Sequence, residues 1–310
     1  MKKVIIISHK NQDTDSVAAS MALAELFGRK KIYQARAAVF GSLNRETEYV
    51  LNRFNLKKPQ KVALSKKQPV FLVDFNEKEQ SPAAFSGLVI EGLVDHHKLN
   101  MCFSKEYPVI FRVEPVGSSC TIVGKMYRDY GAEPDKKTAG LLVSGIVSDT
   151  LKFSSPTTTE EDEKLARELA RKHGINIEKL AREMFEAKSD LSGISANKLI
   201  TMDYKEFKFA KFKTGIGVLE TVNPKMALQR EREIRKALSE HKRKSRIDLV
   251  FFGLVDIVNN NTDLILIGEP EEQAAIKVFK KYPVKDGIMR LLGVVSRKKQ
   301  LVPEFEKKLK

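Results

Sequence analysis

The first 190 residues alternate short apolar runs with longer segments of helical periodicity. Apolar runs of this length suit buried strands, and the amphipathic segments between them suit helices that cover a sheet. The alternation therefore predicts an α/β domain with a largely parallel sheet flanked by helices. Its first helix is expected to be capped at Asp15-Ser16 and to end at Gly28. The predicted strands are Val4–Ile7, Val70–Val73 and Val89–Val94, and the predicted helices are Ser16–Phe27, Arg45–Phe54, Thr121–Tyr130, Thr138–Val147, Thr159–Lys172 and Glu178–Lys188.

The helical pattern stops at residues 188–195, which read KSDLSGIS. Small polar residues gather there, as is typical of a linker. We therefore predict a first domain over residues 1–188, a hinge over 189–195 and a smaller α/β domain with a mixed sheet over 196–310. The elements predicted in the second domain are an alternating segment at Glu206–Phe212, strands at Ile216–Val222 and Ile288–Val295, helices at Pro224–Lys244 and Glu269–Lys280, and a hairpin of Leu249–Val258 with Asp263–Ile267.

The charge balance limits the partners to be expected. Lys and Arg outnumber Asp and Glu by 55 to 40, which gives a net charge of +15 and favours anionic partners such as nucleic acid or phosphorylated small molecules. No stretch approaches the ~18 consecutive apolar residues of a membrane helix, so no membrane partner is expected. The two cysteines, Cys102 and Cys120, are too few for a disulfide framework, and we expect a cytoplasmic protein in which both are buried.

Four short segments rich in Asp and His each follow an apolar run or the end of an apolar helix. Each residue alone has an ordinary explanation, such as a helix cap or a turn. The carboxyl ends of the strands of one parallel sheet lie at the same edge, however, so we expect these side chains to meet. The four segments hold His9, Asp13 and Asp15; Asp74 and Asn76; Asp95, His96 and His97; and Ser148 with Asp149.

Such a group of side chains predicts a metal site. Several carboxylates in one crevice repel each other unless protons or cations neutralise them. Imidazoles mixed with carboxylates are the ligands of transition metals such as Mn²⁺, Co²⁺ or Zn²⁺. Because the candidate ligands outnumber those that one ion needs, the pattern favours two ions.

At this point a family resemblance becomes visible. The segments SHKNQDTDS, VDFNE, VDHHK, PVGSSCT, SDTLKFSSPTTT and GVVSRKKQLVP resemble those of the family II inorganic pyrophosphatases, the manganese-dependent branch of the DHH phosphoesterases. The likeness runs through nearly the whole chain, in order. It implies two Mn²⁺ (or Co²⁺) per subunit, additional Mg²⁺ with the substrate, a homodimer, and an active site in the cleft between the two domains.

The resemblance also implies a role for each matching residue. The first ion would be bound by His9 and Asp13, the second by Asp15, His96 and Asp149, and Asp74 would bridge the two. Asp74, His97, Arg297 and Lys298 would act in catalysis, and the substrate would be bound by His97, Lys205, Arg297 and Lys298.

Two further positions sit beside these ligands. Asp95 is expected to orient an imidazole from outside the ligand set. Phe75 departs from the family pattern, because many relatives carry histidine there. The hydrogen bonds made to the metal-binding side chains are therefore expected to differ from those of relatives that carry histidine at this position.

The expected reaction is hydrolysis of inorganic pyrophosphate to two orthophosphates, through in-line attack by a hydroxide that bridges two divalent ions. Two alternatives stay open. A short-chain exopolyphosphatase or oligonucleotide phosphodiesterase of the same superfamily would share the metal motifs, although the glycine-rich GGGH-like motif of the nuclease branch is absent. A basic nucleic-acid-binding module would explain the charge, but we expect no nucleic-acid partner, because the chain shows no glycine-aromatic RNA motif.

Overall fold

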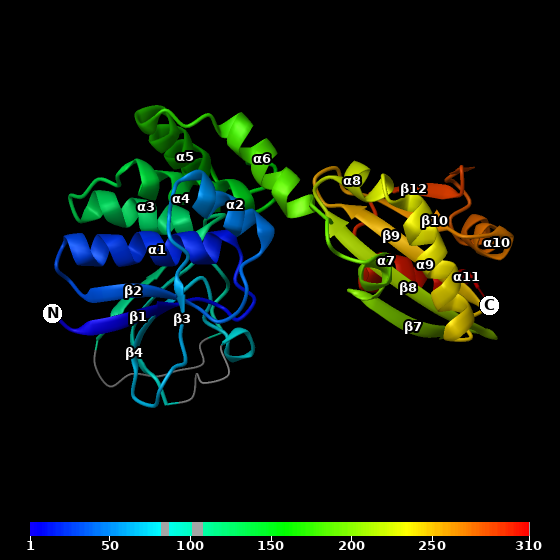
Figure 1. The fold of residues 1–310 in the computed structure, drawn as a ribbon, viewed down its shortest axis with the longest axis horizontal. Coiled ribbons are helices and arrows are strands. Elements are labelled where there is room, and N and C mark those ends of the chain that lie inside the picture. Colours follow the sequence, from blue (N-terminus) through cyan, green and yellow to red (C-terminus); the bar gives the residue numbers. More distant parts are fainter. Residues whose placement is uncertain (82–86, 101–107, 310) are drawn as a thin grey trace. The chain divides into compact units, whose positions relative to one another are not determined.

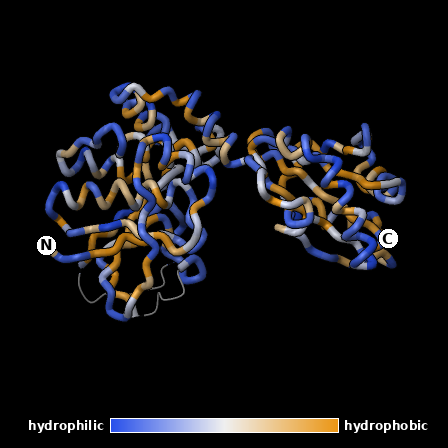
Figure 2. The backbone as a smooth tube through the Cα atoms, viewed as in Figure 1, coloured by the Kyte–Doolittle hydropathy of each residue, from blue (hydrophilic) through white to orange (hydrophobic). Residues whose placement is uncertain are grey.

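The computed structural model describes residues 1–81, 87–100 and 108–309, so Cys102 lies outside the described residues. The chain divides into two compact units, Met1–Ala187 and Lys188–Lys310. Each unit has its own sheet and its own apolar core (Figures 1 and 2), with hydrophobic segments along the strands. The predicted two-domain α/β fold is thereby confirmed.

The sheet of the first unit is parallel throughout, in the order β3-β2-β1-β4-β5-β6. The chain leaves β1 towards β2 and β3, and then returns to the other side of β1 to form β4. The carboxyl ends of β1 and β4 therefore flank the point where the strand order reverses, which is where such sheets bind ligands. The strands are β1 (Lys3–Ile7), β2 (Gln34–Val39), β3 (Gln60–Lys61), β4 (Pro69–Val73), β5 (Val89–Asp95) and β6 (Ile110–Val113).

The helices of the first unit contribute to one core. That core lies between the helices and one face of the sheet, where alternate strand residues such as Val4, Ile6 and Val73 are buried. The other sheet face buries Ile5, Ile7 and Leu72 in a smaller cluster, to which no helical residue in the described part of the chain contributes. The helices are α1 (Thr14–Arg29), α2 (Arg45–Arg53), α3 (Ser119–Asp129), α4 (Lys136–Asp149), α5 (Glu160–His173) and α6 (Ile177–Ser189), with a short 3-10 helix at Lys78–Gln80.

The second unit has a mixed six-stranded sheet in the order β11-β12-β10-β9-β8-β7. Only the pair β8 and β9 is parallel, and β9 and β10 form the predicted hairpin. Its strands are β7 (Tyr204–Phe209), β8 (Phe212–Thr221), β9 (Leu249–Asp256), β10 (Asn261–Leu266), β11 (Val284–Lys285) and β12 (Ile288–Leu292). Its helices are α7 (Ala196–Thr201), α8 (Pro224–Leu228), α9 (Glu231–Lys244), α10 (Glu269–Val278) and α11 (Val302–Lys308), and a π-helical turn, η2, spans Arg297–Leu301.

Two sequence predictions about helices were wrong. The first helix is capped at Asp13 rather than at Asp15-Ser16, and it continues to Arg29, beyond Gly28. The predicted helix Pro224–Lys244 is two helices, separated at residues 229–230. The guanidinium of Arg230 donates hydrogen bonds to the carbonyl oxygens of Leu191 and Ile194, so a contact with the linker accompanies the break.

The apolar pattern also missed β2 and β6. Both strands have exposed or half-buried residues along much of their length, so neither has a continuous apolar run. Among the described residues, no helix combines the length and the apolar character that crossing a membrane requires.

Candidate metal centre

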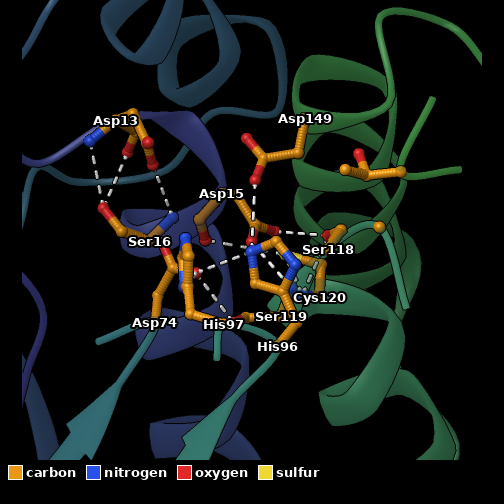
Figure 3. A network of polar contacts seen from close by, with 12 residues as sticks. Asp13, Asp15, Ser16, Asp74, His96, His97, Ser118, Ser119, Cys120 and Asp149 are labelled. Carbon is orange, nitrogen blue, oxygen red and sulfur yellow. Dashed lines mark hydrogen bonds and ion pairs between the residues drawn. The ribbon is translucent and has the colours of Figure 1, made fainter. Parts of the chain in front are cut away.

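The candidate ligands meet at the carboxyl edge of the parallel sheet. His9 follows β1, Asp74 follows β4, and His96 follows β5. Asp13 and Asp15 lie at the start of α1, and Asp149 is the last residue of α4. Figure 3 shows the carboxylate of Asp149 pointing from α4 towards the imidazole of His96.

Asp13 has two structural neighbours, one for each carboxylate oxygen. Its Oδ1 accepts a hydrogen bond from the Ser16 amide at 2.9 Å, and the Ser16 hydroxyl in turn accepts one from the Asp13 amide at 3.0 Å. This reciprocal pair is a capping box that begins α1. The other oxygen, Oδ2, lies 3.5 Å from His9 Nε2. The same side chain therefore starts the helix and faces the site.

Asp15 lies in the first turn of α1 and is fully buried. Its Oδ1 accepts hydrogen bonds from the Ser118 hydroxyl (2.5 Å) and the Cys120 amide (3.0 Å), while Oδ2 accepts one from the Ser119 amide (2.7 Å). The carboxylate thus sits against the amino end of α3, where the helix dipole favours a negative charge. These contacts fix the carboxylate in the site.

Gly145 on α4 makes this position of Asp15 possible. A Cβ atom at residue 145 would lie 2.7 Å from Asp15 Oδ1 and closer still to the sulfur of Cys120. Only a residue without a side chain allows α4 to approach the carboxylate this closely.

Asp74 is the residue that all the candidate groups share. It is 1% exposed, and it adopts a left-handed backbone conformation with φ of 68°. Such a conformation costs a non-glycine residue about 1–3 kcal/mol, so the surrounding structure must hold it in place. One carboxylate oxygen lies 3.4 Å from His9 Nε2, and the other lies 3.3 Å from His96 Nε2. Asp74 therefore presents one oxygen to each side.

His96 supplies an observation that favours a cation. Its Nδ1 is hydrogen-bonded to the Val116 carbonyl at 3.0 Å, which turns Nε2 towards Asp74 and Asp149. Nε2 is buried and has no hydrogen-bond partner in the described structure. Its surroundings are the carboxylates of Asp74 and Asp149, and a metal ion among them would take the place of a proton on Nε2.

The side chains form two groups that meet at Asp74. The first is His9, Asp13 and Asp74, and the second is Asp15, Asp74, His96 and Asp149; within each, one ligand atom per residue lies within 4.8 Å of the others. Asp74, His96 and His97 form a third, overlapping group. The structure thus brings together all six residues predicted as ligands. Their donor set fits transition metals, while their role as ligands stays a prediction.

The pKa values show how strongly the site favours positive charge. Burial lowers the pKa of His9, but the carboxylates of Asp13 and Asp74 outweigh it and raise the pKa to about 10. For His96, Asp74 likewise outweighs burial and raises the pKa to about 9. Burial and then the Asp74 carboxylate raise the pKa of Asp15 to about 6. Without a cation, protons on the imidazoles partly neutralise the carboxylates.

His97 is held differently from His96. Its Nδ1 and the Asp95 carboxylate lie 2.8 Å apart, and this hydrogen bond is the main reason that its pKa is raised. Asp95 is fully buried and also accepts a hydrogen bond from Asn76 at 2.6 Å. The His97 side chain is 43% exposed, so its Nε2 is free to face a substrate. Asp95 therefore orients the imidazole of His97, whereas the imidazole of His96 is oriented by the Val116 carbonyl.

The three substrate-binding residues predicted in the second unit lie in one region of it. Lys205 on β7 is paired in register with Ile216 on β8. Arg297 donates to the carbonyl oxygens of Asp203 (2.6 Å) and Ile216 (3.4 Å), and to the Asp203 carboxylate (2.5 Å). Lys205 and Lys298 are exposed to solvent, whereas only 10% of the surface of the Arg297 side chain is exposed. Asp203 thus holds Arg297 beside the strand of Lys205.

Sequence reasoning missed several supporting residues. Ser118 and Ser119 lie in the quoted segment PVGSSCT, but no role was deduced for them. The Ser119 hydroxyl donates to Asp74 at 2.8 Å. Asp162 is fully buried and accepts hydrogen bonds from the Gly117 amide (2.8 Å) and the Thr121 hydroxyl (2.5 Å), which fixes this loop. A serine pair before an apolar helix was the only available signal.

Phe75 points away from the ligands. It is 1% exposed and belongs to the apolar cluster on the second face of the sheet, together with Ile7 and Leu72. Hydrogen bonding next to the ligands comes instead from Asn76, which donates to Asp95.

Comparisons with known proteins agree on one family. The chain matches the family model "DHH family, N-terminal domain" over residues 3–146 and the model "DHHA2 domain" over residues 182–308. It is 37% identical over 306 residues to a protein of Exiguobacterium sp., covering 98% of this chain and 97% of that one, and 37% identical over 313 residues to one of Bacillus licheniformis, covering 100% of both. Both are named probable manganese-dependent inorganic pyrophosphatases.

A solved structure is similar over the same extent. The crystal structure of a Methanococcus jannaschii putative family II inorganic pyrophosphatase shares 33% identity with this chain and covers 98% of both chains, with a TM-score of 0.65.

Substitution of Gly145 by alanine tests the packing around Asp15. The new methyl group would displace Asp15 and Cys120, so Gly145→Ala should weaken Mn²⁺ binding about 10- to 100-fold, as loss of support around a ligand typically does. Titration calorimetry measures this. Gly124→Ala is the matched control, because the three atoms nearest to its Cβ would all belong to the side chain of Leu165. Equal Mn²⁺ affinity in both variants would contradict the packing argument.

The raised histidine pKa values predict proton release on metal binding. At pH 7.5 His9 and His96 carry protons in the metal-free protein, because their pKa values of about 10 and 9 lie above that pH. A metal needs the neutral imidazole, so binding should release about two protons per chain, and affinity should rise with pH up to those pKa values. Calorimetry in buffers of different ionisation enthalpy counts the protons; a count of zero would show that these imidazoles receive no metal.

Proposed function

The chain belongs to the manganese-dependent inorganic pyrophosphatase family, and we propose that it hydrolyses inorganic pyrophosphate to two orthophosphates. The observation that carries the proposal is the position of Asp74. Its two carboxylate oxygens face the two candidate ligand groups separately. Such an arrangement suits two cations a few ångströms apart.

The residues of the first unit would hold the ions and steady the reaction. The first ion would be bound by His9, Asp13 and Asp74, and the second by Asp15, Asp74, His96 and Asp149. Two divalent cations there, Mn²⁺ or Co²⁺, would supply the nucleophile for an in-line displacement by lowering the pKa of a water between them. The four aspartates contribute a charge of about −4, which two such ions balance before substrate arrives.

His97 would act on the leaving phosphate. Asp95 holds its Nδ1, which leaves Nε2 for an oxygen of the substrate. The hydrogen bond to Asp95 raises the pKa of His97, so a larger fraction of the rings carries a proton that can pass to the departing oxygen.

Pyrophosphate brings about three or four further negative charges that need other cations. Lys205, Arg297 and Lys298 would supply them, with additional Mg²⁺ on the substrate. Arg297 is oriented by Asp203 and only 10% of its side chain is exposed, so its guanidinium would exchange part of the Asp203 contact for phosphate. Because these residues belong to the second unit, the proposal requires residues of both units to contact the substrate.

The predicted hinge would lie where the chain passes between the units. Residues 190–195 contain no helix or strand, and Gly193 has a φ of 75°. Arg230 binds this segment to the second unit through Leu191 and Ile194. Bending would therefore be concentrated on the side of the linker nearer α6. A homodimer, which the family resemblance implies, and a cytoplasmic location, which the small number of cysteines favours, complete the proposal.

The reaction can be tested by removing and restoring the metal. The chelated protein should release no phosphate from pyrophosphate, and Mn²⁺ or Co²⁺ should restore activity more fully than Mg²⁺, because imidazole ligands favour transition metals. Parallel assays with tripolyphosphate and a dinucleotide distinguish the alternatives. Faster turnover of either one than of pyrophosphate would favour an exopolyphosphatase or a phosphodiesterase and reject the proposal.

The phosphate-binding role of the second unit has its own test. Replacing Arg297 and Lys298 together by alanine should leave Mn²⁺ affinity unchanged and reduce kcat/KM by about 100-fold or more, because each lost charge contact is worth about 1.5–3 kcal/mol. Lys298→Ala alone is the cleaner variant, since Arg297 also bonds to Asp203.

Lys299→Ala is the matched control for Lys298→Ala. Lys299 is an exposed lysine on the same turn and is not assigned to the substrate. Parallel loss of Mn²⁺ affinity in the double variant, or equal loss of turnover in Lys298→Ala and Lys299→Ala, would contradict this division of roles.

A further inference from the structure

A cavity in the first unit, away from the ligand groups, is lined by basic side chains. Its volume is about 350 Å³, and it lies between the end of α2, the start of α4 and the start of α6. Four cationic residues line it: Arg53, Lys136, Lys137 and Lys179. No carboxylate is among the described residues that line it.

The three lysines of the cavity are poorly neutralised by the protein itself. No carboxylate partner is found for Lys136 in the described part of the chain, and Lys137 reaches only the carbonyl oxygen of Asn55, at 3.2 Å. Lys179 lies 3.9 Å from Glu183, at the far limit of an ion pair. The cavity therefore keeps a surplus of positive charge.

The positions of Lys136 and Lys137 make this surplus unusual. They are the first two residues of α4, where the helix dipole disfavours positive charge. In the same unit, α5 carries four acidic residues in its first turn. Asp135, the N-cap of α4, supplies one carboxylate at this helix end, so the two lysines leave a net positive charge there that a bound anion would balance.

The remaining walls of the cavity are apolar. Phe54 and Leu180 are buried and Ile175 is half-buried, and all three line it. An apolar wall beside several cations suits a ligand with a flat ring and a charged phosphate group. The volume lies at the small end of the range that ligand pockets occupy, about 300–1,000 Å³, so one compact molecule fits.

We propose that this cavity binds a nucleoside mono- or diphosphate, with the phosphates among Lys136, Lys137, Lys179 and Arg53 and the base against Phe54 and Leu180. The site is separate from the proposed metal centre, but the two share α4. That helix begins at the cavity and ends at Asp149.

Calorimetric titration with ADP tests the proposal. The manganese-loaded protein should bind ADP, and Lys136→Ala combined with Lys179→Ala should weaken that binding at least tenfold. Pyrophosphate hydrolysis without ADP should stay unchanged, because neither lysine belongs to the catalytic residues. Lys164→Ala with Arg171→Ala, two exposed cations of α5 outside the cavity, should bind ADP as the parent protein does.

Several outcomes would overturn the proposal. One is the absence of ADP binding to the parent protein at millimolar concentration. Another is equal ADP affinity in the two double variants, which would locate binding elsewhere. Orthophosphate binding that Lys136→Ala with Lys179→Ala weakens as much as it weakens ADP binding would show that the base contributes nothing, and would reject a nucleotide as the ligand. None of these results depends on whether pyrophosphate is the substrate.

Discussion

The first unit is organised around one buried carboxylate. Asp74 has almost no exposure and a strained backbone, and its two oxygens face two different imidazoles. Asp13, Asp15 and Asp149 add negative charge within a few ångströms. Such a cluster is stable only when positive charge is supplied, by protons on His9 and His96 or by cations. The site is therefore built to hold positive charge, and the proposed reaction uses that property.

The fold accounts for how distant residues reach this cluster. Reversal of the strand order between β1 and β4 places the loops after both strands at the same edge. Helices α1 and α3 then add their amino ends, with Asp15 lying against the first amides of α3. Every predicted ligand thus comes from the end of a strand or a helix, where the backbone is fixed by hydrogen bonds.

Much of this was visible in the sequence, because it depends on local patterns. Apolar runs followed by Asp and His predicted β1, β4 and β5 and the residues that meet at their ends. The sequence did not reveal contacts made by ordinary residues over long separations. Ser119 with Asp74, Asp162 with Gly117, and Asp203 with Arg297 are examples. The break between α8 and α9 is similar, because Arg230 binds a linker almost forty residues away in the chain.

The double duty of Asp13 has an evolutionary consequence. Enzymes commonly gain stability when a charged active-site residue is removed, since such residues are held in unfavourable surroundings. Most replacements of Asp13 would not bring such a gain in stability, because its Oδ1 caps α1 while its Oδ2 faces His9. Asparagine alone among the uncharged residues combines a similar shape with good capping ability. Folding therefore excludes replacements that cannot cap a helix, whereas the carboxylate itself is preserved only by selection on the chemistry.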